Sequence, residues 1–204
     1  MNRFKHIIFV VALAIAPALL ITSCTKDNGP AGESYGIFTV TNDTTVVVNG
    51  TINGRSEQDW DLVSQDYPNI SYMVLEDCPG SSDDDANLRM ALDIHRQGVS
   101  MHLRSNSSIE SGAVDLYLAG KRRTRENGAR VGVHSWEATD GLQGGDLPRN
   151  DPEHQPYLNY FTGIGMSQQQ AEDFYFFTLE AASANNMHYM TDAELARFNF
   201  FTNE

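Results

Sequence analysis

The sequence has few of the residues that build cross-linked or metal-bound domains. Only two of its 204 residues are cysteines, Cys24 and Cys78. Two cysteines allow one disulfide at most, which excludes a disulfide scaffold. No group of cysteines and histidines has the spacing of a zinc site. We therefore expect no bound metal and no other cofactor.

Basic residues are also scarce. The chain has 14 Lys and Arg against 27 Asp and Glu, a formal net charge of −13. A surface with this excess of negative charge repels phosphate backbones and anionic lipid headgroups. The composition therefore argues against nucleic acid as a partner.

Long apolar runs are absent except at the N-terminus. Arg3 and Lys5 precede a continuous apolar run over residues 7–21, and Ile21-Thr22-Ser23-Cys24 has the form of a lipobox. The run is shorter than the roughly 20 residues of a membrane-spanning helix. We predict that residues 1–23 are a lipoprotein signal peptide and that Cys24 becomes the lipid-modified N-terminus. A plain secretory peptide is the alternative.

Residues 24–34 are polar and contain glycine and proline, which is typical of a short tether. No aspartate follows Cys24 directly, which favours the outer membrane over the inner one. We therefore expect a lipid-anchored protein of the bacterial cell envelope, facing either the periplasm or the outside. With Cys24 lipidated, Cys78 has no partner and is predicted to be a small buried residue.

Residues 35–204 are expected to form one α/β domain. β-branched runs at 37–40 and 44–48 flank a turn signal and predict a hairpin or two consecutive strands. Strand and helix patterns alternate after that, which predicts a mostly parallel sheet with its functional loops beyond the carboxyl ends of the strands. Gly80, Ser81 and Ser111 follow such strands, so we expect them at one edge of the sheet.

Several further signals concern the helices and one loop. Capping-box patterns at Ser56, Ser167 and Thr191 predict three helix starts. The acidic residues 83–85 are interpreted as complements to a helix dipole and not as metal ligands. Aromatic residues of the last helices, such as Tyr175, are expected in the core or at a subunit contact. Residues 137–153 are rich in Gly, Asp and Pro and predict a long surface loop.

The stretch from 105 to 136 carries the predicted chemistry. Ser111 is followed by Gly112 and Ala113 and then by an apolar run, which predicts a sharp turn into a helix. Backbone N–H groups at a helix start are unpaired and favour a developing negative charge. His134 ends a predicted strand 23 residues later. One serine and one histidine do not by themselves identify a catalytic pair.

A family resemblance adds to this pattern. Ser111, Ala119-Gly120, the basic run 121–123 and the motif Arg130-Val131-x-x-His134 resemble the catalytic core of the Clp protease proteolytic subunit, and most closely its secreted relatives. The resemblance implies the ClpP/crotonase-like fold, with repeated β-β-α units and a mostly parallel sheet. It also implies Ser111 as nucleophile, His134 as general base and the N–H of Gly112 as part of an oxyanion hole.

The sequence departs from the family pattern at two places. Relatives carry Pro-Gly-Gly where this chain has Pro79-Gly80-Ser81, so the second oxyanion donor would be the N–H of Ser81. They carry aspartate at the third triad position, where this chain is predicted to place Asn186. A change from Asp to Asn at that position costs about ten-thousandfold in turnover.

These features lead to two main hypotheses. The first is a lipid-anchored serine peptidase-like protein that acts on a peptide or protein substrate, self-associates and needs no ATPase partner. The second is a catalytically inactive binding or scaffold lipoprotein with the same fold. Acyl-CoA chemistry, as in crotonases, has only the fold in its favour.

Overall fold

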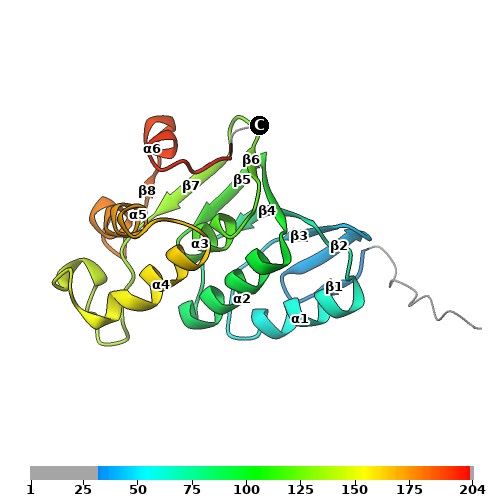
Figure 1. Ribbon diagram of the computed structural model, residues 1–204, viewed down its shortest axis with the longest axis horizontal. Coiled ribbons are helices and arrows are strands. Elements are labelled where there is room, and N and C mark those ends of the chain that lie inside the picture. Colours follow the sequence, from blue (N-terminus) through cyan, green and yellow to red (C-terminus); the bar gives the residue numbers. More distant parts are fainter. Residues whose placement is uncertain (1–31, 203–204) are drawn as a thin grey trace, which may run out of the picture.

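The computed structural model describes residues 32–202 (Figure 1). The predicted signal peptide, Cys24 and most of the tether lie outside the described residues. Within the described part of the chain, no helix has both the length and the apolar character needed to cross a bilayer. The strands are β1 (Ser34–Tyr35), β2 (Phe38–Asn42), β3 (Thr45–Val48), β4 (Tyr72–Cys78), β5 (Ser100–Glu110), β6 (Arg123–Arg125), β7 (Arg130–Val133) and β8 (His188–Tyr189). The α-helices are α1 (Ser56–Asp66), α2 (Asp84–Gln97), α3 (Gly112–Leu118), α4 (Gln155–Gly163), α5 (Gln168–Ala181) and α6 (Asp192–Arg197).

All eight strands belong to one sheet, in the order β1-β2-β3-β4-β5-β7-β8, with β6 also beside β5. β3, β4, β5 and β7 are parallel in the centre, and the antiparallel pairs lie at the two ends. The predicted hairpin is confirmed as β2 and β3. The prediction of an α/β fold with a mostly parallel sheet is also confirmed. α1, α2 and α3 connect the central strands in turn, and each connection returns the chain to a strand parallel to the one before it.

β5 is longer than the sequence pattern predicts, and it changes neighbour along its length. Its first half pairs with β6 through Met101–Leu103, and its second half pairs with β7 through Ser108–Glu110. The register against β4 shifts between the halves, where the buried Ser107 hydroxyl donates to the Leu75 carbonyl at 2.6 Å. This shift directs the end of β5, and therefore Ser111, toward β7.

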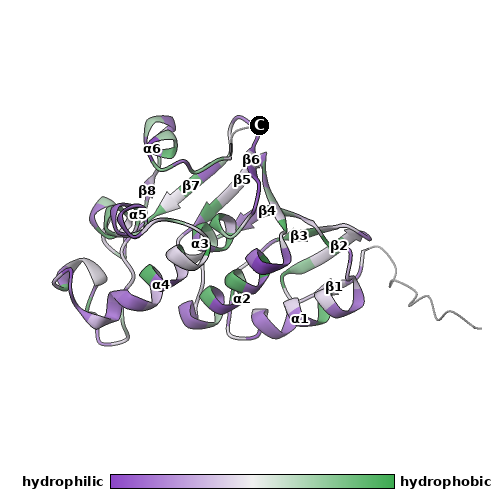
Figure 2. Ribbon diagram, viewed as in Figure 1, coloured by the Kyte–Doolittle hydropathy of each residue, from purple (hydrophilic) through white to green (hydrophobic). Residues whose placement is uncertain are grey.

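The helices cover the sheet and enclose the core. α2 packs against α1, α3 and α4, and polar and apolar residues alternate along it (Figure 2). The core holds large fully buried side chains, among them Trp60, Tyr117 and Tyr175. Cys78 is buried as predicted, and its thiol donates to the Gly50 carbonyl at 3.0 Å. Burial raises the pKa of this thiol to about 12, so Cys78 is structural and not reactive.

Two of the three predicted helix caps are present. Ser167 and Thr191 each form a complete capping box at the start of α5 and α6. α1 starts at Ser56 as predicted, but Ser56 does not cap it. Arg55 occupies the cap position without a side-chain hydrogen bond, and the buried Ser56 hydroxyl accepts instead from the N–H of Asn53. The loop before α1 therefore uses the serine that the pattern assigned to the helix.

Candidate active site

Ser111 lies at a sharp turn between β5 and α3. Its backbone has φ 52° and ψ −130°, and it is one of two non-glycine residues with positive φ in the described chain. Its N–H donates to the Gly132 carbonyl of β7 at 3.0 Å, which fixes the turn to the sheet. Positive φ costs a side-chain-bearing residue of order 1–3 kcal/mol, and such strain concentrates at functional sites. The geometry is that of a nucleophile elbow.

The loop after β4 packs directly on this turn. A β-carbon at Gly80, whose φ is +120°, would lie 2.9 Å from Ser111 Cβ, so no larger residue fits there. A β-carbon at Gly112 would lie 2.7 Å from Ser81 Cβ. The structure therefore brings together the four residues of the predicted nucleophile and oxyanion hole. Among the described residues, no backbone hydrogen bond uses the N–H of Ser81 or Gly112.

Ser81 replaces a family glycine without backbone strain. It is not among the residues with positive φ, whereas Gly80 is. The glycine at the second position is therefore not required by backbone conformation in this chain. The Ser81 hydroxyl donates to the carboxylate of Asp84 at the start of α2.

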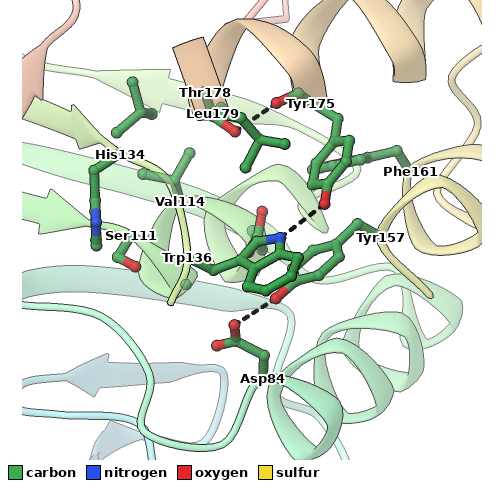
Figure 3. A pocket seen from close by; sticks show the side chains of 13 residues that line it. Asp84, Ser111, Val114, His134, Trp136, Tyr157, Phe161, Tyr175, Thr178 and Leu179 are labelled. Carbon is green, nitrogen blue, oxygen red and sulfur yellow. Dashed lines mark hydrogen bonds between the residues drawn. The ribbon is translucent and has the colours of Figure 1, made fainter. Parts of the chain in front are cut away.

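His134 follows β7 and lines the same pocket as Ser111 (Figure 3). No hydrogen bond joins the two side chains among the described residues. Catalytic hydrogen bonds are often poorly aligned before substrate binds, so this geometry does not exclude the pair. The Nδ1 nitrogen of His134 is unusual, because it is buried and has no hydrogen-bond partner in the described chain. A catalytic histidine normally uses this nitrogen to fix its tautomer and orientation.

Asn186 does not occupy the orienting position, and the prediction is corrected here. Its side chain is exposed, and its Nδ2 donates to the Ser183 hydroxyl at 2.7 Å. Its N–H donates to the Ser183 carbonyl at 2.9 Å, so the residue belongs to a tight turn before β8. The turn holds the amide away from His134.

The strand register places Met187 beside His134 instead. β7 and β8 pair Gly132 with Tyr189 and Val133 with His188. One further step along this antiparallel register sets Met187 opposite His134, on the same face of the sheet. Met187 covers that face, since a β-carbon at Gly132 would lie 2.7 Å from its sulfur. A thioether is only a weak acceptor, so a methionine at this position supplies no strong partner for Nδ1.

The pocket in front of Ser111 contains residues that the sequence analysis did not assign to it. Trp136, Tyr157 and Tyr175 form an aromatic wall, and Asp84 and Asp115 contribute carboxyl groups (Figure 3). Tyr175 was expected to be a core or contact residue. Tyr175 is both buried and a pocket residue, because the pocket reaches into the core. Among these pocket residues, only Asp115 had a signal in the sequence. It lies four residues after Ser111, the spacing at which two residues share one face of a helix.

The two carboxyl groups have different surroundings. Asp84 accepts from the Tyr157 hydroxyl at 2.5 Å and from Ser81. No hydrogen bond or ion pair engages the Asp115 carboxyl within the described residues. Burial raises the pKa of Asp115 well above its ordinary value, and the nearby Asp84 carboxylate raises it further. The pocket floor therefore favours a protonated carboxyl. No group of three or more His, Cys, Asp or Glu in residues 32–202 is placed to hold a metal ion.

Comparison with known proteins locates the fold. No protein-family model matches the sequence, and no curated protein matches it. Among solved structures, the chain is similar to a mutant of 1510-N, a membrane-bound stomatin-specific protease, in complex with a substrate peptide. The identity is 16% and the TM-score is 0.50, and the match covers 78% of this chain and 72% of the other. It is also similar to a mutant of ClpP1 from Listeria monocytogenes, at 13% identity and a TM-score of 0.50, over 78% and 89% of the two chains. At these identities the likeness shows a ClpP-like fold.

Proposed function

We propose that this protein is a serine hydrolase that cleaves peptide bonds with Ser111 as nucleophile and His134 as general base. The observation that carries the proposal is the strained turn at Ser111, with the backbone N–H groups of Ser81 and Gly112 beside it and His134 in the same pocket. The N–H groups would bind the oxyanion of the tetrahedral intermediate. The similarity in fold to two proteases adds support.

The proposed chemistry has two steps. Ser111 Oγ bonds to the acyl carbon while its proton passes to His134, and the C–N bond then breaks as His134 returns that proton to the leaving amine. Water next attacks the acyl carbon and gives up a proton to His134. The bond between that carbon and Ser111 Oγ then breaks, His134 returns the proton to Oγ, and the acid is released. Without a partner on Nδ1, the imidazolium that forms in each step is poorly stabilised. We therefore expect slow turnover from a dyad.

A fluorophosphonate probe tests the proposal directly. The purified domain 32–204 should be labelled in a time-dependent manner, and Ser111→Ala should abolish labelling. His134→Ala should slow it strongly. Ser108→Ala, a neighbouring serine of β5, is the matched control and should label like the parent. Absence of labelling in a domain that is shown to be folded by circular dichroism would contradict the proposal.

The unpaired His134 Nδ1 favours a second candidate function, an inactive binding or scaffold protein with this fold. This candidate predicts a folded domain that binds peptide and resists every serine-directed probe. Self-association belongs to both candidates as a proposal, and light scattering of the purified domain would measure it.

We also propose that Cys24 anchors the protein by a lipid to the bacterial outer membrane. The lipobox form of residues 21–24 supports this placement. Cys24→Ala should either release the protein from the membrane fraction or leave residues 1–23 attached, and Cys78→Ala should do neither. Unchanged processing and membrane association in Cys24→Ala would contradict the anchor.

A further inference from the structure

The pocket in front of Ser111 has little internal space. It holds about 40 Å³ for water-sized molecules, within a wider region of about 430 Å³ that opens to solvent. An engineered apolar cavity of about 150 Å³ takes up a benzene molecule. The space beside Ser111 is about a quarter of that. It suits a hydrogen, a methyl or a hydroxymethyl group, but no branched or aromatic side chain.

Trp136 is the residue that limits this space. Its indole stacks on Tyr157 with ring centroids 6.4 Å apart and an interplanar angle of 6°. Its Nε1–H donates to the Tyr175 hydroxyl at 2.8 Å. Figure 3 shows the indole between Ser111 and the tyrosines of α4 and α5. The ring therefore closes the side of the pocket that faces these helices.

The backbone around Trp136 holds the indole in this position. A β-carbon at Gly144 would lie 2.5 Å from the indole, so the 3-10 turn at Gly144–Asp146 packs directly on the ring. The N–H of Gly144 donates to the Trp136 carbonyl at 3.0 Å. On the other side, the N–H of Ser135 donates to the Ala182 carbonyl at 2.8 Å. With its ring and backbone both fixed, Trp136 acts as a rigid wall and not as a movable gate.

The charge of the pocket adds a second restriction. Asp84 and Asp115 are its acidic lining residues, and neither forms an ion pair within the described chain. An acidic substrate side chain would face both carboxyl groups in a desolvated space, which is unfavourable. We infer that the pocket accepts the side chain on the acyl side of the cleaved bond, and that Trp136 restricts this residue to Gly, Ala or Ser. The inference rests on the proposed function.

Activated esters provide the test, because they react even with a weak hydrolase. The substrates are the p-nitrophenyl esters of N-acetyl Gly, Ala, Leu and Phe, and kcat/KM is measured for the Ser111-dependent part of the rate. The parent should prefer Ala to Leu and Phe by about tenfold or more, which is the usual discrimination of a pocket that is too small. Trp136→Leu should reverse that order by raising the values for Leu and Phe.

Two further variants control for other effects of the change. Leu62→Ala, at an exposed position of α1 outside the pocket, should keep the parent order. Trp136→Phe opens less space than Trp136→Leu and gives an intermediate result if the larger change unfolds the domain. A parent enzyme that hydrolyses the Phe ester as fast as the Ala ester overturns the inference and leaves the proposed function intact. If no ester shows Ser111-dependent hydrolysis and the fluorophosphonate does not label Ser111, the proposed function fails and the inference falls with it.

Discussion

At the scale of single residues, the position opposite His134 controls how well this site can work. Met187 stands there, and the Nδ1 of His134 is buried without a partner. Met187→Asp would put a carboxylate beside that nitrogen, where it stabilises the imidazolium. We expect the variant to raise Ser111-dependent probe labelling and ester hydrolysis by at least about tenfold. Both rates are measured on the parent and the variant.

Asn186→Asp is the matched control for this change. It adds the same charge one residue earlier, in the turn that is bonded to Ser183. It should leave the rates near those of the parent. A gain with Asn186→Asp and none with Met187→Asp would show that the register near β8 differs from the one described. Met187→Asp combined with Ser111→Ala should be silent.

The strain at Ser111 makes a separate prediction about stability. Glycine adopts positive φ without cost, and alanine does not. Ser111→Gly should therefore be more stable to urea than Ser111→Ala, by about 1 kcal/mol. The same pair of changes at Ser108, within β5, should give the opposite order, because glycine weakens a strand. Equal stability of the two Ser111 variants would contradict the strained turn.

The sequence predicted the elements of the site better than their exact partners. The order of strands and helices was enough to place Gly80, Ser81 and Ser111 at one edge, because parallel strands bring their carboxyl ends together. It could not place Met187, since a two-residue strand has no periodicity from which a register can be read. Trp136 and Tyr157 were missed for a related reason. Buried aromatic residues have the same pattern whether they fill a core or line a pocket.

At the scale of secondary-structure elements, α3 connects the core to the candidate nucleophile. Leu116 on this helix is fully buried, whereas Leu62 on α1 is 46% exposed. Leu116→Ala should lower the free energy of unfolding by about 2–5 kcal/mol through the cavity it leaves. Leu62→Ala should change it by less than about 0.5 kcal/mol. Urea denaturation of both variants measures the difference, and similar losses would mean that α3 is not packed as described.

The caps show why local signals succeed at some helices and fail at others. Ser167 and Thr191 precede helices at exposed positions, where nothing competes for the hydroxyl. Ser56 is buried, and the loop before α1 needs an acceptor for the N–H of Asn53. The Ser56 hydroxyl is therefore engaged by the loop and does not cap α1. A sequence pattern cannot show this competition.

At the scale of the whole molecule, the sheet joins three distant segments into one pocket and buries carboxyl groups as it does so. The loop after β4, the start of α3 and the end of β7 meet near Ser111, and side chains of α4 and α5 line the pocket beside it (Figure 3). The acidic chain thereby places Asp84 and Asp115 close together. Two carboxyl groups this close repel each other when both are ionised. The free energy of unfolding therefore depends on pH.

The sign of this dependence follows from Asp115. Its pKa is raised by burial first and by Asp84 second, so the folded chain holds a proton that the unfolded chain releases near pH 4. Between the unfolded and folded pKa values the folded state binds more protons, and the free energy of unfolding falls as the pH rises. Asp115→Asn cannot ionise. It should therefore be more stable than the parent at neutral pH and should lose this advantage below about pH 4. Asp43→Asn, at an exposed turn, is the control and should show no such change. Urea denaturation at several pH values measures both. An Asn variant that is equally destabilised at every pH would instead mean that the Asp115 carboxyl makes a favourable contact, and the pocket floor would then be charged and not neutral.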